Sequence, residues 1–156
     1  MNNELLARLL EGDEEAIDQF GESDNCAVID WRDGFPELIS AVEPFLPKGH
    51  LQLEQIDEVT FQLYAGSNGP QAINVTANVK QEALIELLNR ALMPDFELRQ
   101  FTPNDGDGYS LYVAPSTVWQ EIKRTHPDAV EEYFLSAERL AAYWRKSYLA
   151  RLFSKP

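Results

Sequence analysis

The sequence has a single cysteine, Cys26, and only two histidines, His50 and His126. One cysteine cannot form an internal disulfide bond. The two histidines lie far apart in the chain, so no compact His/Cys ligand set with the usual spacing is present. We therefore expect no structural zinc site and no cofactor.

The sequence also lacks the patterns that direct a chain into or across a membrane. It has no positively charged start followed by an apolar run, which is the mark of a secretory signal. Its longest apolar stretches, such as residues 83–92, contain Glu and Arg and are far shorter than the roughly 20 residues needed to span a bilayer. We expect a cytoplasmic protein without a membrane span.

Basic residues are scarce. There are 13 Lys and Arg against 26 Asp and Glu, which gives a formal net charge of -13 and a sequence pI near 4.4. Eight acids and one base fall in residues 1–25, whereas residues 136–156 hold five bases and one acid. Phosphate binding needs clustered Lys and Arg, so nucleic acid is not expected as a partner. The excess of acids instead suits a basic protein partner.

Catalytic and ligand-binding motifs are missing as well. Residues 104–108 (NDGDG) suggest a calcium loop, but no Glu stands at the twelfth position, and we interpret them as a hairpin turn. Residues 66–70 lack the Gly-Lys-Ser/Thr ending of a phosphate loop. His126 precedes Pro127 and is interpreted as part of a helix entry rather than a general base. We therefore predict a non-catalytic protein.

Hydrophobic spacing predicts the secondary structure. The length and the 44% hydrophobic content suit one domain over residues 1–156, with an acidic helical segment (1–24), an α/β core (25–115) and C-terminal helices (116–156). We predict an α+β fold: a mainly antiparallel sheet of about five to six strands, helices on one face, and helical N- and C-terminal extensions. The N-terminal segment is expected to form two helices, with Gly12 ending the first and Asp13 capping the second. The expected core elements are a strand at 26–31, a helix from Pro36, strands near 51–53, 59–63 and, after a turn at 66–70, 73–77, a helix capped by Asn78, a hairpin (96–100 and 109–113), and a helix capped by Ser116 or Thr117. The helix after Asn78 is expected to bury Leu84, Leu87, Leu88 and Leu92.

The core also contains a possible repeat. A strand-helix-strand-strand pattern covers residues 27–64, and a similar pattern covers residues 72–112. Ordinary alternation of elements would give much the same match. The sequence leaves both explanations open.

Three groups of acidic residues are the candidate binding sites for a basic partner. We selected acids that have aromatic neighbours or lie at predicted turns: Asp30, Trp31 and Asp33; Glu54, Asp57 and Glu58; Asp105 and Asp107. In the first group, Arg32 could simply pair with a carboxylate beside a buried Trp, or the Trp and Arg could be exposed for binding. The basic, aromatic helix predicted at 138–153 could likewise pack on its own domain or bind a partner.

From Pro36 onward the element order, which is helix, three strands, helix, two strands and helix, resembles that of type III secretion chaperones. These are also small, acidic and cytoplasmic. In size and acidity the chain is similar to bacterial immunity proteins, which neutralise basic toxin domains. The favoured hypothesis is an immunity or inhibitor protein for a basic bacterial toxin domain, with a nuclease as one candidate. The alternative is a cytoplasmic secretion chaperone for an effector, and the third hypothesis is an enzyme with a carboxylate site. The chain would be a monomer or a homodimer.

Overall fold

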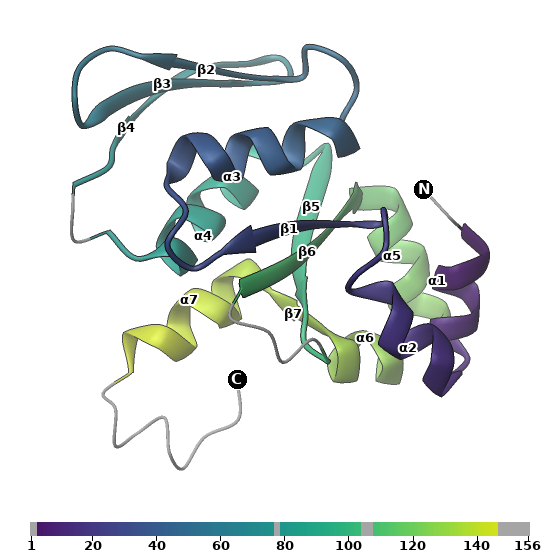
Figure 1. Cartoon of the computed structure of the whole chain (residues 1–156). Coiled ribbons are helices and arrows are strands. Elements are labelled where there is room, and N and C mark those ends of the chain that lie inside the picture. The colour runs from purple at the N-terminus through teal and green to yellow at the C-terminus, as the bar shows by residue number, and fades with distance from the viewer. Residues whose placement is uncertain (1–2, 77–78, 104–107, 147–156) are drawn as a thin grey trace.

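The computed structural model describes residues 3–76, 79–103 and 108–146 (Figure 1). Within these ranges the chain forms an α+β fold with two antiparallel sheets. The elements are α1 (Asn3–Leu10), α2 (Glu14–Phe20), β1 (Cys26–Asp30), α3 (Phe35–Val42), the 3-10 turn η1 (Glu43–Phe45), β2 (Leu51–Gln55), β3 (Thr60–Ala65), β4 (Asn68–Asn74), α4 (Gln81–Leu92), β5 (Phe96–Phe101), β6 (Gly108–Pro115), α5 (Ser116–Thr125), α6 (Pro127–Tyr133), β7 (Phe134–Ser136) and α7 (Ala137–Arg145). None of the helices in these ranges is long and apolar enough to cross a membrane.

Local sequence signals account for the first helices. Gly12 adopts a positive φ of 82° just beyond α1, a conformation that glycine tolerates best. The Asp13 side chain then caps α2 by accepting a hydrogen bond from the backbone N–H of Ala16 at 3.1 Å. Pro36 lies in the first turn of α3, where its missing N–H costs nothing. These three predictions are confirmed.

The four-stranded sheet has the order β1-β6-β5-β7, and its central strand β6 is buried on both faces. Leu111 and Val113 point into one hydrophobic core, and Tyr112 and Ala114 point into another. The first core is completed by α3, α4 and α7, and the second by α1, α2, α5 and α6. Helices therefore cover both faces of this sheet.

The three-stranded sheet has the order β2-β3-β4 and buries only one face. Phe61, Leu63 and Ala65 of β3 join the first core, while the intervening Gln62 and Tyr64 are only half-buried. The molecule thus stacks as the three-stranded sheet, the layer of α3, α4 and α7, the four-stranded sheet, and helices α1, α2, α5 and α6 (Figure 1).

The prediction of one sheet with helices on one face is wrong in both respects. Seven strands are described, and they divide into two sheets on either side of α3 and α4. Strand β6 gives the physical reason for helices on both faces. Its side chains are buried on both faces of the sheet, and most of them are apolar, so helices must cover both faces. Aromatic side chains of α2 and α5, Phe20 and Trp119, pack against the second face.

The two strand-helix-strand-strand units exchange their first strands. The first unit is β1-α3-β2-β3 and the second is β4-α4-β5-β6. Strand β1 pairs with β6 of the second unit, and β4 pairs with β3 of the first unit. The resulting orders, β1-β6-β5 and β4-β3-β2, correspond strand for strand. The topology is thus symmetric even where the sequence match is faint.

Several predicted boundaries are wrong. Lys80 rather than Asn78 stands at the N-cap of α4, and Asn78, like Ala77 of the expected third strand, lies outside the described residues. Pro115 rather than Ser116 or Thr117 stands at the N-cap of α5. Strand β4 begins at Asn68, so the turn predicted at 66–70 is shorter than expected. Strand β7 was not predicted, because three residues are too few to establish an alternating pattern.

Candidate functional site

The first acidic group forms a tight corner at the end of β1. Arg32 donates from Nε to Oδ1 of Asp30 at 2.9 Å and from Nη2 to Oδ2 at 2.6 Å. Asp33 accepts a hydrogen bond from the backbone N–H of Asp30 at 2.9 Å. The bonds from Arg32 lower the pKa of Asp30 to about 2. Both carboxylates of this corner therefore take part in shaping the turn.

Trp31 and Arg32 are both exposed, as in the second of the two arrangements considered in the sequence. The local Arg-carboxylate pair forms, yet the Trp31 side chain is 59% exposed instead of buried. The Arg32 guanidinium lies 5.6 Å from the centroid of the Trp31 ring. The corner thus presents an exposed aromatic ring whose neighbours are held in place.

This corner forms one wall of a cleft of about 490 Å³. The other walls come from the chain before α4, the first turn of α4, strand β6 and helix α7. Figure 1 shows the β1–α3 turn, the start of α4 and the end of α7 on the same side of the molecule. The lining residues are Trp31, Arg32, Asp33, Gly34, Val75, Val79, Lys80, Gln81, Glu82, Leu84, Tyr109 and Trp144. A second cavity of about 520 Å³ shares four of these residues, including Glu82 and Trp144, and extends to Arg145 and Lys146.

Glu82 is the most deeply placed acid in this cleft. Only 7% of it is exposed, and the Tyr109 hydroxyl donates to its Oε1 at 2.5 Å. Burial, together with the hydrogen bond to this carboxylate, raises the pKa of Tyr109 above its ordinary range, so the phenol stays protonated and donates at neutral pH. The sequence analysis did not select either residue.

A shift in the assumed helix face explains why Glu82 was missed. We predicted that Leu84, Leu87, Leu88 and Leu92 form the buried stripe of α4, but Ile85 is also completely buried and Leu87 is only half-buried. Placing Ile85 on the stripe puts Glu82, three residues earlier, on the same face. This spacing is the signal that could have identified it.

The second acidic group lies around the turn between β2 and β3. Asp57 accepts hydrogen bonds at Oδ1 from the backbone N–H groups of Val59 (2.9 Å) and Thr60 (2.8 Å). These bonds lower the pKa of Asp57, and they fix the turn. Glu54 and Glu58 are exposed on either side of it.

The same turn exposes two apolar side chains that the sequence analysis did not select. Ile56 is 55% exposed and Val59 is 38% exposed. The available signal was an aliphatic pair among the acidic residues of a turn, because Gly, Pro, Asn, Asp and Ser are the residues that dominate turns. We name residues 54–59 the acidic hairpin tip.

The structure does not gather the acidic groups into one cluster. Asp30 ends a strand of the four-stranded sheet, whereas Glu54 lies on the three-stranded sheet. Asp105 and Asp107 lie outside the described residues. In the described ranges, no group of three or more His, Cys, Asp or Glu is arranged to hold a metal ion.

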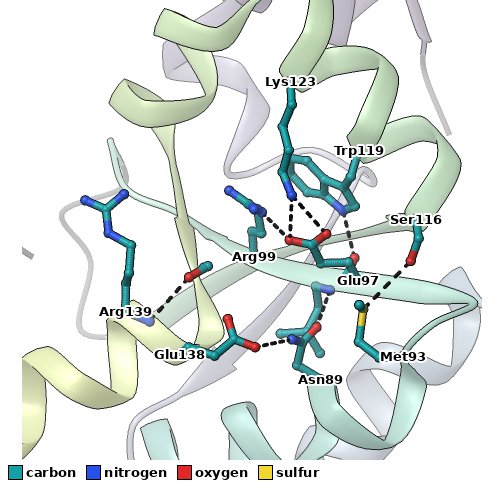
Figure 2. Close-up of polar contacts among 11 residues, drawn as sticks. Asn89, Met93, Glu97, Arg99, Ser116, Trp119, Lys123, Glu138 and Arg139 are labelled. Carbon is teal, nitrogen blue, oxygen red and sulfur yellow. Dashed lines mark hydrogen bonds and ion pairs between the residues drawn. The ribbon is translucent and has the colours of Figure 1, made fainter.

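A set of partly buried polar contacts lies elsewhere, around β5, and is drawn in Figure 2. Glu97 accepts from Arg99 at 2.6 Å and from Lys123 at 3.3 Å, and its backbone carbonyl accepts from Trp119 Nε1 at 2.8 Å. Asn89 accepts from the backbone N–H of Leu98 at 2.9 Å and donates to the Glu138 carboxylate at 3.1 Å. Because these groups satisfy one another, the network stabilises the packing of α4, α5 and α7 on β5.

Helix α7 packs on the core along its described length. Leu140 and Ala141 are buried, and Arg145 forms an ion pair with Glu86 of α4. Over this range the basic, aromatic helix therefore contacts its own domain. Residues 147–153 of the predicted helix lie outside the described part of the chain.

Comparison with known proteins gives no relative from which a function could be transferred. No family model, curated protein or solved structure matches this chain.

Proposed function

We propose that this protein binds a basic protein domain through the acidic hairpin tip and acts as an inhibitor of the immunity type. The exposed pair Ile56 and Val59, placed between exposed carboxylates, is the observation that carries the proposal. Apolar contacts at the centre of an interface contribute most of the affinity, and charges around them contribute specificity and association rate. A net charge of -13 would attract such a partner over a longer range.

The bonds of Asp57 support this role. An interface loop that is already ordered loses less conformational entropy on binding than a mobile one. Asp57 holds the backbone of Val59 and Thr60, so both apolar side chains are presented from a fixed turn. Glu54 and Glu58 are then the carboxylates available to pair with Lys or Arg of the partner.

A secretion chaperone is the second candidate. It would present a sizeable apolar surface to an extended client segment. In the described ranges the large exposed apolar side chains are Val28, Trp31, Ile56, Val59 and Met93. Only Ile56 and Val59 among them share one turn, and this small patch favours a compact folded partner over an extended client.

The test is an affinity capture from the native host lysate at low and high salt, with four forms of the protein. These are the wild type, the apolar variant Ile56→Ser/Val59→Ser, the charge variant Glu54→Lys/Glu58→Lys, and a control. The control, Glu14→Lys/Asp18→Lys, reverses two exposed acids on helix α2, away from the acidic hairpin tip. We expect a partner with a folded basic domain to be retained by the wild type and the control. The apolar variant should weaken binding by roughly tenfold or more, equivalent to about 1.4 kcal/mol.

The comparison of low and high salt separates the apolar contribution to affinity from the electrostatic one. Loss of affinity in the charge variant should be largest at low salt, because screening removes the Coulombic term at high salt. Equal binding by all four forms would overturn the proposal. Retention of a client through an unfolded segment would favour the chaperone instead.

A further inference from the structure

We propose that the cleft beside Trp31 binds a small α-amino acid with an apolar side chain, through its carboxylate and its ammonium group. This site is separate from the acidic hairpin tip, and the inference does not depend on the proposed function. It rests on a donor and an acceptor that lie next to each other at the start of α4 and remain incompletely paired.

The donor is the side-chain amide of Gln81. Only 6% of this residue is exposed, and its buried Nε2 has no hydrogen-bond partner among the described residues. A buried N–H group without a partner costs about 1–3 kcal/mol, so such a group in a cleft points to an acceptor that arrives with a ligand.

The N-terminus of α4 supports binding of a carboxylate at the same place. The helix has 12 residues, and its N-cap residue, Lys80, makes no side-chain capping bond. The positive end of the helix dipole favours an anionic group here. Lys80 lines the cleft and adds positive charge, whereas the charge of Arg32 is balanced by its ion pair with Asp30.

The acceptor is the Glu82 carboxylate. Tyr109 is its one hydrogen-bond partner in the described part of the chain, and this bond uses Oε1. A buried carboxylate is stabilised by a cation that pairs with it. Gln81 and Glu82 both line the cleft, so one ligand that carries a carboxylate and an ammonium group can meet both residues.

The remaining walls define the ligand's side chain. Trp31, Trp144, Val75, Val79 and Leu84 are aromatic or aliphatic, and the volume of about 490 Å³ is ample for a single apolar amino acid. A simple anion would be repelled by Glu82, and a simple cation by Lys80. A zwitterion satisfies both ends.

The test is isothermal titration of the full-length protein with L-phenylalanine, N-acetyl-L-phenylalanine and L-phenylalaninamide. The second ligand lacks the ammonium group and the third lacks the carboxylate. We expect L-phenylalanine to bind and each analogue to bind roughly tenfold more weakly or worse. L-Leucine serves as a second apolar probe.

Two variants assign the ends of the ligand. Glu82→Gln keeps an acceptor for Tyr109 and should weaken L-phenylalanine while leaving the N-acetyl analogue unchanged. Gln81→Leu should weaken L-phenylalanine while leaving L-phenylalaninamide unchanged. Glu121→Gln, on the exposed face of α5, is the control. Trp31→Ala changes an exposed side chain, so it should lower affinity without altering the fold, and circular dichroism checks each variant.

The proposal would be overturned if the folded wild type showed no binding at roughly 10 mM ligand, because the binding free energy would then be weaker than about 3 kcal/mol. Equal affinity for all three phenylalanine ligands, or no effect of Trp31→Ala, would overturn it as well. These results need no protein partner, so they are independent of the hairpin-tip experiment.

Discussion

Asn89 links three elements of the first core, and its replacement by alanine is the sharpest test of the packing described here. The residue is almost completely buried, and its two polar atoms serve different partners. Its Oδ1 accepts from the backbone N–H of Leu98, and its Nδ2 donates to Glu138 of α7. The pairing of β5 with β7 begins at Arg99, so Asn89 supplies an acceptor just beyond the end of that ladder.

The magnitude follows from these two bonds. Asn89→Ala leaves the Leu98 N–H buried without a partner and also removes packing, and we expect roughly 2–4 kcal/mol of destabilisation. The bond to Glu138 contributes less, because Glu138 is exposed and regains water when the bond is lost. Glu138→Ala instead leaves the buried Nδ2 of Asn89 without its acceptor, and we expect it to cost about 1–3 kcal/mol.

Equilibrium unfolding in urea, monitored by circular dichroism, measures the free energy of unfolding of both variants. For a chain of this size the Asn89→Ala loss corresponds to a fall in Tm of roughly 4–16 °C. Asn74→Ala, on the exposed strand β4, is the matched control and should change the free energy of unfolding by less than about 0.5 kcal/mol. If Asn89→Ala were no more destabilising than this control, the backbone role assigned to Asn89 would be refuted.

Three further predictions concern other parts of the fold. Because the pKa of Asp30 falls from 3.8 to about 2 on folding, its pairing with Arg32 stabilises the protein above about pH 4 and is lost as the pH falls towards 2. Thermal unfolding from pH 5 to pH 2 should thus show a shallower loss of stability for Asp30→Asn, and parallel curves would contradict this. Burial raises the pKa of Cys26 to about 12, so a thiol reagent at pH 8 should modify it only after denaturation, and rapid labelling of the native protein would be inconsistent with its position. A Cβ atom on Gly108 would lie 2.4 Å from the backbone oxygen of Ile29, so Gly108→Ala should lower the free energy of unfolding by roughly 1–3 kcal/mol in urea titrations, and an unchanged midpoint would disprove the close β1–β6 approach.

The limits of sequence-based prediction show most clearly in helix α4. Its apolar spacing and its end before Pro94 predict the helix itself, because a 3.6-residue period is a local property of the chain. The same spacing does not decide which side of the helix faces the core. Two apolar stripes that differ by one residue can be drawn through Leu84, Ile85, Leu87 and Leu88. The choice between them decides whether Glu82 and Asn89 are exposed or buried, and the sequence alone does not make it.

The candidate sites show the same division. The acidic residues were selected from sequence, but a buried Trp31 fitted the sequence as well as an exposed one did, and Val59 was assigned to a strand while Ile56 was not selected. Exposure depends on what packs against a side chain, and that comes from elements distant in the sequence. The cleft itself is formed by four such elements, including α4 and α7.

The sequence by itself determined the acidic charge, the antiparallel α+β class and most helices and strands, because charge, capping and hydrophobic period are written in neighbouring residues. Only the tertiary structure decided that the strands divide into two sheets, that β1 and β4 exchange between the units, and that Glu82 and Gln81 lie in a cleft. These features depend on long-range packing of apolar faces, for which the local sequence offers several solutions of similar energy.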